Sequence, residues 1–244
     1  MADLPVDAAG AVAGLSAGGL RLEQFLDDMS VETKWIAGHH IVWQTGQQNG
    51  ADGSTPEDHT HCSAFVAAVA LDLDIYILRP PSHPQELLAN AQVAWLDGGD
   101  YPGPAATASG WQPLGTSGDP AVIARAVELA NAGKLVVGGY LQPAVTDPAT
   151  GNLVRKPGHV VVVRPQPGNF ASATEPLVTM ASTRNWRLIQ MAAAFSAHPG
   201  AWPAAIRLFV HDTDLEEDGM APIDPTSGTG AESEGLGSHS ATVK

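Results

Sequence analysis

The chain has 244 residues, of which 44% are hydrophobic, and it carries a formal net charge of −14. This length and hydrophobic fraction allow one large domain or two small ones with a packed core. The acidic balance argues against nucleic-acid binding, because phosphates require clustered lysine and arginine. No uninterrupted apolar run is long enough to span a bilayer, so no membrane span is expected.

The two ends of the chain differ in composition from the middle. Residues 1–19 are rich in alanine and glycine without a usable period, and we expect a mobile arm there. No basic residue precedes Arg21, so no Sec-type signal is visible and the location stays open. Residues 213–244 are acidic and poor in large apolar side chains, which predicts a flexible tail. A single domain is therefore expected over residues 20–212.

Hydrophobic spacing predicts helices mainly in the first half of this domain and strands in the second. Pro120 suits the first turn of a helix and Gly133 suits its C-terminal cap. This order of elements indicates an α+β fold. The expected helices lie at 20–29, 63–71, 86–96 and 120–132, a loop at 97–119, and the extended segments at 41–43, 75–78, 135–137, 160–163, 177–180 and 206–210.

The only cysteine, Cys62, stands where polar residues stop and small apolar residues begin, in His-Cys-Ser-Ala-Phe-Val-Ala. A buried cysteine usually behaves as a small hydrophobe. A thiol in the first turn of a helix instead feels the positive end of the helix dipole, which stabilises the thiolate. One cysteine cannot form an intramolecular disulfide, so nothing here demands an oxidising compartment.

His159 begins a strong predicted strand in Lys-Pro-Gly-His-Val-Val-Val-Val. A histidine at the mouth of a strand can reach a group at the N-terminus of a helix that packs on the sheet. If that group is Cys62, the imidazole takes the thiol proton and leaves an activated thiolate–imidazolium pair. The N–H groups at the start of the helix would then stabilise an oxyanion. The plainer interpretation is that the two residues occur together by chance.

These two motifs, His-Cys-Ser-Ala-Phe-Val and Pro-Gly-His-Val-Val-Val-Val, resemble the paired signatures of NlpC-type cell-wall cysteine peptidases and the related CHAP amidases. The resemblance implies a papain-like fold in which a helical N-terminal half packs on an antiparallel sheet. It implies Cys62 as nucleophile and His159 as general base, with no cofactor. A peptide or peptidoglycan fragment would be the substrate, in a bacterial cell envelope or after export, and an inhibitor or immunity protein would be a natural partner.

The third residue of the catalytic set is where the sequence departs from this family. The family places a polar residue on the strand after the histidine strand, and Met180, the best-matching position, cannot orient an imidazole. A simple hairpin would bring Ser182 near His159. Asn185 is preferred, because its carbonyl can accept a hydrogen bond from the ring. A dyad oriented by water or backbone is the remaining alternative.

Three further residues are assigned to substrate or oxyanion binding by the same resemblance. Trp43 and Gln44 occupy a segment like the aromatic-containing one that precedes the family's cysteine, although the loop to Cys62 is longer here. Ser63 directly follows the nucleophile.

Two other kinds of function stay open at this level. The first is a catalytically inactive papain-like domain that binds a partner, which is favoured if nothing orients His159. The second is a zinc hydrolase that uses His59 and His61 beside Cys62, since histidine and cysteine at short spacing can bind zinc. A single such cluster lacks an evident fourth ligand, so no metal is expected.

Overall fold

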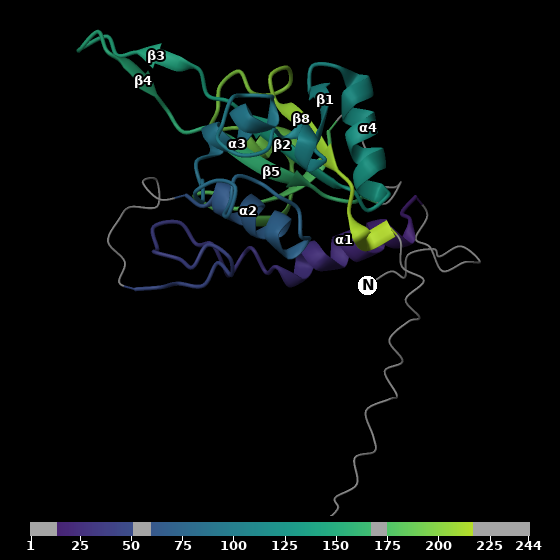
Figure 1. Ribbon diagram of the computed structural model, residues 1–244. Helices are drawn as coiled ribbons and strands as arrows, with labels where there is room; N and C mark the ends of the chain where they lie inside the picture. The colour runs from purple at the N-terminus through teal and green to yellow at the C-terminus, as the bar shows by residue number, and fades with distance from the viewer. Residues whose placement is uncertain (1–13, 51–59, 167–174, 217–244) are drawn as a thin grey trace, which may run out of the picture.

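The structure of the protein is a computed structural model that describes residues 14–50, 60–166 and 175–216. It is an α+β fold in which helices cover an antiparallel sheet (Figure 1). The helices are α1 (Ala17–Asp28), α2 (Cys62–Asp72), α3 (Ala89–Leu96), α4 (Pro120–Asn131) and α5 (Met191–Ala194). The strands are β1 (Gln112–Thr116), β2 (Leu135–Tyr140), β3 (Ala144–Thr146), β4 (Leu153–Arg155), β5 (His159–Val163), β6 (Leu177–Met180), β7 (Trp186–Gln190) and β8 (Arg207–His211).

Six of these strands form one sheet in the order β1-β8-β2-β5-β6-β7, and all neighbours are antiparallel. The last strand in the chain, β8, lies between β1 and β2. β2 and β5 pair directly, with Tyr140 opposite His159. The chain between them leaves the sheet to form the separate β3–β4 hairpin, which projects from the body (Figure 1).

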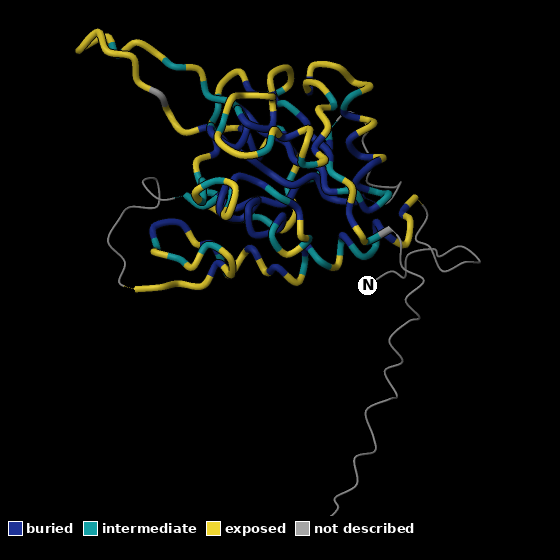
Figure 2. The backbone as a smooth tube through the Cα atoms, in the orientation of Figure 1, coloured by how far each residue is buried: buried dark blue, intermediate teal, exposed yellow. Residues whose placement is uncertain are grey.

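Each face of the sheet packs against its own hydrophobic cluster. On one side, here called the α2 face, α2 and α3 lie against β2 and β5, whose contributing side chains include Val137, Val160 and Val162. On the other side, the α4 face, α4 and α5 lie against residues such as Val161 and Val163. This division follows from the pleat, because successive residues of a strand point to opposite faces. Figure 2 shows the buried strands between the two helical layers.

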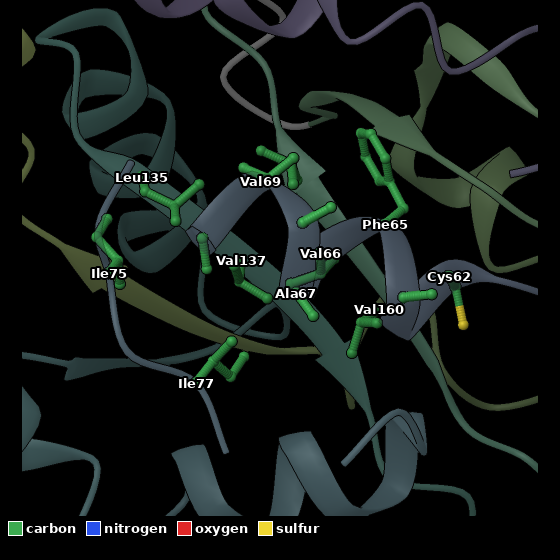
Figure 3. Packing of buried hydrophobic residues seen from close by; sticks show 14 of the residues in the cluster. Cys62, Phe65, Val66, Ala67, Val69, Ile75, Ile77, Leu135, Val137 and Val160 are labelled. Atoms are coloured by element: carbon green, nitrogen blue, oxygen red, sulfur yellow. The ribbon is translucent and has the colours of Figure 1, made fainter. Parts of the chain in front are cut away.

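Helix α2 is buried along most of its length because its residues are apolar or small on every side. All residues from Cys62 to Ala70 are buried. Figure 3 shows the helix side chains against Leu135, Val137 and Val160 of the sheet, with Cys62 at the start of the helix. No helix in the described part of the chain is both long and apolar enough to cross a membrane.

Both boundaries of the domain lie further out than the composition suggested. Helix α1 begins at Ala17, where the Ser16 side chain accepts a hydrogen bond from the N–H of Gly19, and Leu15 is buried. At the other end, the Thr213 hydroxyl donates to the carbonyl of Gly133, and Leu215 packs on the core. The remainder of the expected arm and tail, residues 1–13 and 217–244, lies outside the described residues.

Several expected elements differ in the structure. The segment 75–78 is buried but is not a strand, and the chain turns at Leu78, where φ is +36°. The expected loop at 97–119 contains β1, an edge strand that tolerates Pro113 because an edge residue need not donate to the sheet. The predicted helix at 86–96 begins only at Ala89. Strands β3, β4 and β7 were not predicted, since their side chains are largely exposed and lack an apolar pattern.

Candidate active site

The Cys62 thiol lies at the N-terminus of α2, and its residue is only 4% exposed. Burial raises the pKa of this thiol, because removal of water disfavours the charged form. Nearby polar groups act in the opposite direction: the N–H groups of Val160, Ser63 and Cys62, and the dipole of the Ser63 hydroxyl, each lower the pKa by a smaller amount. Desolvation dominates, so the thiol is held neutral near pH 7.

His159 is the first residue of β5 and is 3% exposed. Its Nε2 atom lies 3.4 Å from Met180 Sδ. The ring meets Phe195 edge-on, with centroids 5.1 Å apart, and stacks on His198 at 5.5 Å with an interplanar angle of 12°. Burial, and to a lesser extent the charge of His198, lower the pKa of His159 to about 3. The imidazole is therefore neutral at physiological pH.

The fold brings Cys62 and His159 to the same end of β5. The N–H of Val160, the residue that directly follows His159, lowers the pKa of the thiol, and Val160 and Cys62 belong to the same buried cluster. The contacts of the two side chains differ, however. Cys62 packs with Val160 in the cluster of the α2 face, whereas the His159 ring contacts Met180 and Phe195, which belong to the cluster of the α4 face.

No hydrogen bond joins the Cys62 thiol to the His159 ring in this structure, although both residues are described. The expected thiolate–imidazolium pair is not supported, because the pKa of the thiol is raised and that of the imidazole is lowered. The physical cause is the same for both groups. Each is buried, and within the part of the chain that the structure describes neither has an opposite charge beside it to favour its ionised form.

The expected orienting residue, Asn185, is engaged elsewhere. Its Nδ2 atom donates to the carbonyls of Val31, Lys34 and Trp35, and its Oδ1 atom accepts from the N–H of Ser182. These bonds fix the loop after α1 to the β6–β7 turn. Asn185 therefore has a structural role in this conformation, and its assignment as the group that orients His159 is corrected.

Ser182 does not orient the ring either. The β5–β6 register has Val162 opposite Thr179 and Val163 opposite Val178, so its continuation places Ser182 opposite His159, as a simple hairpin predicts. Pairing stops before this point, and the ring turns instead to Met180. The position that best matched the family's polar residue is thus the one that contacts His159, but it carries a thioether.

The residues expected at the oxyanion site are divided between the two ends of α2. Gln44 lines a pocket with Asp72, the last residue of α2, whereas Cys62 is the first. Eleven helical residues span about 16 Å, which places Gln44 away from the thiol. The carbonyl of Trp43 accepts a hydrogen bond from the Trp35 indole in the same loop. Their assignment to the oxyanion site is therefore corrected.

Ser63 remains next to the thiol, and its polar groups brace the start of α2. The hydroxyl donates to the carbonyl of Leu87, and the Ser63 carbonyl accepts a hydrogen bond of 3.0 Å from Gln92 Nε2. Gln92 is completely buried, and its Nε2 atom also donates to the carbonyl of Glu86. The segment before α3 is thereby tied to the first turn of α2.

The residues of the zinc alternative lie at the same helix start. His61 is the N-cap of α2, and its Nε2 atom lies 3.0 Å from the carbonyl oxygen of His39. His59 lies outside the described residues. Within residues 14–50, 60–166 and 175–216, no three His, Cys, Asp or Glu side chains are arranged to hold a metal ion.

His198, which lies after α5 in the stretch Ser-Ala-His-Pro-Gly-Ala-Trp-Pro, is a further residue of the site that the sequence did not indicate. Its Nδ1 atom lies 3.3 Å from Gln142 Oε1, and burial lowers its pKa. It thus forms one wall of the His159 environment and reaches toward the segment after β2. No local pattern marks this role, because the contact depends on the fold.

No family model, curated protein or solved structure matches this chain. The roles of Cys62 and His159 therefore rest on the contacts of the described residues and on the two sequence motifs.

Proposed function

We propose that the protein is a papain-like cysteine hydrolase that cleaves an amide bond, with Cys62 as nucleophile and His159 as general base. The observation that carries this proposal is the position of the Cys62 thiol at the N-terminus of the buried helix α2. There the only thiol of the chain shares a buried cluster with Val160, the residue that directly follows His159. The likeness of both motifs to NlpC-type peptidases and CHAP amidases suggests peptidoglycan stem peptides as the substrate class.

The neutral state of both groups determines the mechanism that we propose. This mechanism requires the start of β5 to rearrange, so that the His159 ring leaves Met180 on the α4 face and reaches the thiol on the α2 face. There the ring accepts the thiol proton while Sγ attacks the carbonyl carbon of the substrate. The N–H groups at the start of α2 stabilise the resulting oxyanion. The imidazolium then gives the proton to the leaving amine as the C–N bond breaks and a thioester forms. Water, activated by the imidazole, hydrolyses the thioester and restores the free thiol.

A second candidate function is a catalytically inactive papain-like domain that binds a peptide. The observation that favours it is the contact of Met180 Sδ with His159 Nε2. A thioether is only a weak acceptor, so it holds the ring less firmly than the carbonyl oxygen of an amide would. Such a domain would retain the buried thiol as part of its core.

Cleavage of purified peptidoglycan and of synthetic stem peptides, followed by mass spectrometry, separates the two candidates. The hydrolase releases new amine and carboxyl ends, and Cys62→Ser or His159→Ala lowers the rate by at least about 100-fold. Arg125→Gln, on an exposed side of α4, is the control and keeps the rate of the wild type. Folded wild-type protein that cleaves none of these amides would contradict the hydrolase and support the inactive binding domain.

A further inference from the structure

A pocket of about 490 Å³ lies between the start of α3 and the segment that leads into His159. Its apolar lining includes Leu88, Ala91, Ala94, Tyr101 and Leu141. Leu88 is 66% exposed. The volume is within the range of sites that bind small molecules or single side chains, and such sites are mostly apolar with a few polar groups.

Hydrogen bonds hold the walls of this pocket in place. Asn90 Nδ2 donates to the carbonyl of Lys156 over 2.9 Å, and Asn90 Oδ1 accepts from the N–H of Gln142 over 3.1 Å. The Asn90 side chain of α3 thereby holds the two segments at the base of the β3–β4 hairpin, one before β3 and the other after β4. A Cβ atom on Gly158 would lie 2.4 Å from Asn90 Oδ1 and from the Tyr140 carbonyl oxygen, so this approach requires glycine.

The pocket adjoins both parts of the candidate active site. Pro157, in its lining, lies two residues before His159. Glu86 and Leu88, also in its lining, flank Leu87 in the sequence, and the carbonyl of Leu87 accepts the hydroxyl hydrogen of Ser63, the neighbour of Cys62. A peptide whose amide bond reaches the thiol therefore has this pocket beside it.

Two charged residues line the pocket, and their situations differ. Glu86 Oε1 already accepts a hydrogen bond from the N–H of Leu88 over 2.8 Å. Lys156 is exposed, and no ion pair or side-chain hydrogen bond engages its ammonium among the described residues. The chain as a whole has 12 basic and 26 acidic residues, and Lys156 is the positively charged residue in the lining of this pocket.

We infer that this pocket binds a peptide residue with an aliphatic side chain and a free carboxylate, which pairs with Lys156. The aliphatic part covers Leu88 and the alanines of α3, and burial of its apolar surface supplies most of the affinity. The carboxylate supplies selectivity, because a charge-assisted hydrogen bond to an ammonium is stronger than a neutral one. As a substrate subsite the inference rests on the proposed hydrolase, whereas the binding itself does not.

Binding of N-acetyl-alanyl-leucine and of its C-terminal amide to full-length Cys62→Ala, measured by NMR titration at low salt, tests the pocket without turnover. The free acid binds about tenfold more tightly than the amide. Its shifts centre on residues 86–94, 141 and 156–157. Equal binding of acid and amide, tighter binding of the amide, or shifts centred elsewhere would overturn the inference.

Three variants in the Cys62→Ala background separate the effect of the Lys156 charge from the effect of the shape of the pocket. Lys156→Gln removes the preference for the acid and leaves binding of the amide unchanged. Ala94→Leu fills part of the hollow and weakens both probes. Arg125→Gln removes one positive charge from α4, away from the pocket, and keeps the preference of about tenfold. If Arg125→Gln abolished the preference as well, the effect would arise from net charge and the inference would fail.

These outcomes are distinguishable from failure of the proposed function. Selective binding of the acid without any cleavage by wild-type protein would retain the pocket and reject the hydrolase. Cleavage that depends on Cys62, with probes that bind equally as acid and amide, would retain the hydrolase and reject the pocket.

Discussion

On the α2 face, the central sheet meets one thiol among aliphatic side chains, whereas on the α4 face it meets two imidazoles beside Phe195 and Met180. The thiol has backbone N–H groups around it, which favour a negative charge. Among the described residues, no carboxylate lies beside the His159 imidazole to favour a positive charge. Both groups are neutral, but for the thiol desolvation outweighs the effect of these N–H groups, whereas for the imidazole desolvation has little to oppose it.

The comparison shows why residue identity alone does not specify chemistry. Cysteine and histidine at a helix start and a strand start form an ion pair only if the protein stabilises both charges more than it desolvates them. In this fold the sheet brings the two residues to one end of β5 but gives their side chains different neighbours. The following predictions test how separate the two environments are.

The largest expected effect is a loss of stability that is confined to the α2 face. Phe65 is completely buried on α2 and meets Trp35 edge-on, with ring centroids 5.3 Å apart. Phe65→Ala should lower the free energy of unfolding by about 3–5 kcal/mol, because it leaves a cavity. Urea denaturation measures the loss, and the NMR signals of the His159 ring should stay in place. A shift of those signals would show that the faces are coupled.

A smaller effect concerns pH and the α4 face. In the unfolded chain a histidine has a pKa of about 6.5, whereas His159 in the folded protein has a pKa of about 3. The unfolded state therefore binds the proton first, so the stabilisation is present above about pH 6.5 and is lost as the pH falls toward 3. Between pH 7 and pH 5, the wild type should lose about 2 kcal/mol more than His159→Gln. Equal losses in urea titrations of the two proteins would contradict this.

The thiol should respond at the other end of the pH scale. Burial raises the pKa of Cys62, so the alkylation rate with iodoacetamide should rise only above the pH at which an ordinary thiol ionises, about 8.5. At pH 8 the folded protein should react at least about tenfold more slowly than the urea-unfolded control. Rapid alkylation near pH 6 that disappears in His159→Gln would show that a thiolate–imidazolium pair forms after all.

The smallest expected change in stability comes from Met180. Met180→Leu keeps the volume and should cost less than about 1.5 kcal/mol, with the pKa of His159 unchanged. Met180→Gln instead offers an oxygen acceptor to His159 Nε2–H, which favours the imidazolium and should raise the pKa of His159 in an NMR titration. If the hydrolase proposal holds, the glutamine variant should also cleave faster. An unchanged pKa of His159 in Met180→Gln would mean that the side chain at position 180 does not influence the protonation of the ring.

Local signals in the sequence predicted the parts of the fold that local chemistry determines. Pro120 and Gly133 mark the two ends of α4, and the structure has the helix at Pro120–Asn131 with Gly133 at φ +97° just beyond it. The apolar run that begins at Cys62 gave α2 to within one residue at either end. The structure also confirms the α+β class, which the order of predicted helices and strands along the chain indicates.

The site depends on contacts between distant parts of the chain, which no local pattern encodes. Asn185 bonds to carbonyls of residues 31–35, and the ring of His159 packs on Phe195 and His198 beyond two further strands. The sequence therefore predicted which residues lie at the starts of α2 and β5, but not which residues their side chains contact.

The position of β8 between β1 and β2 has a consequence for synthesis on the ribosome. Residues 207–211 leave the ribosome after every other strand of the sheet, yet they pair with both of these neighbours. Until then β1 has no partner and β2 has one open edge, which is a condition that favours association with other chains. The nascent protein therefore completes its sheet only after residue 211 has left the ribosome, and we expect chaperone dependence to be greatest for chains that end before residue 207.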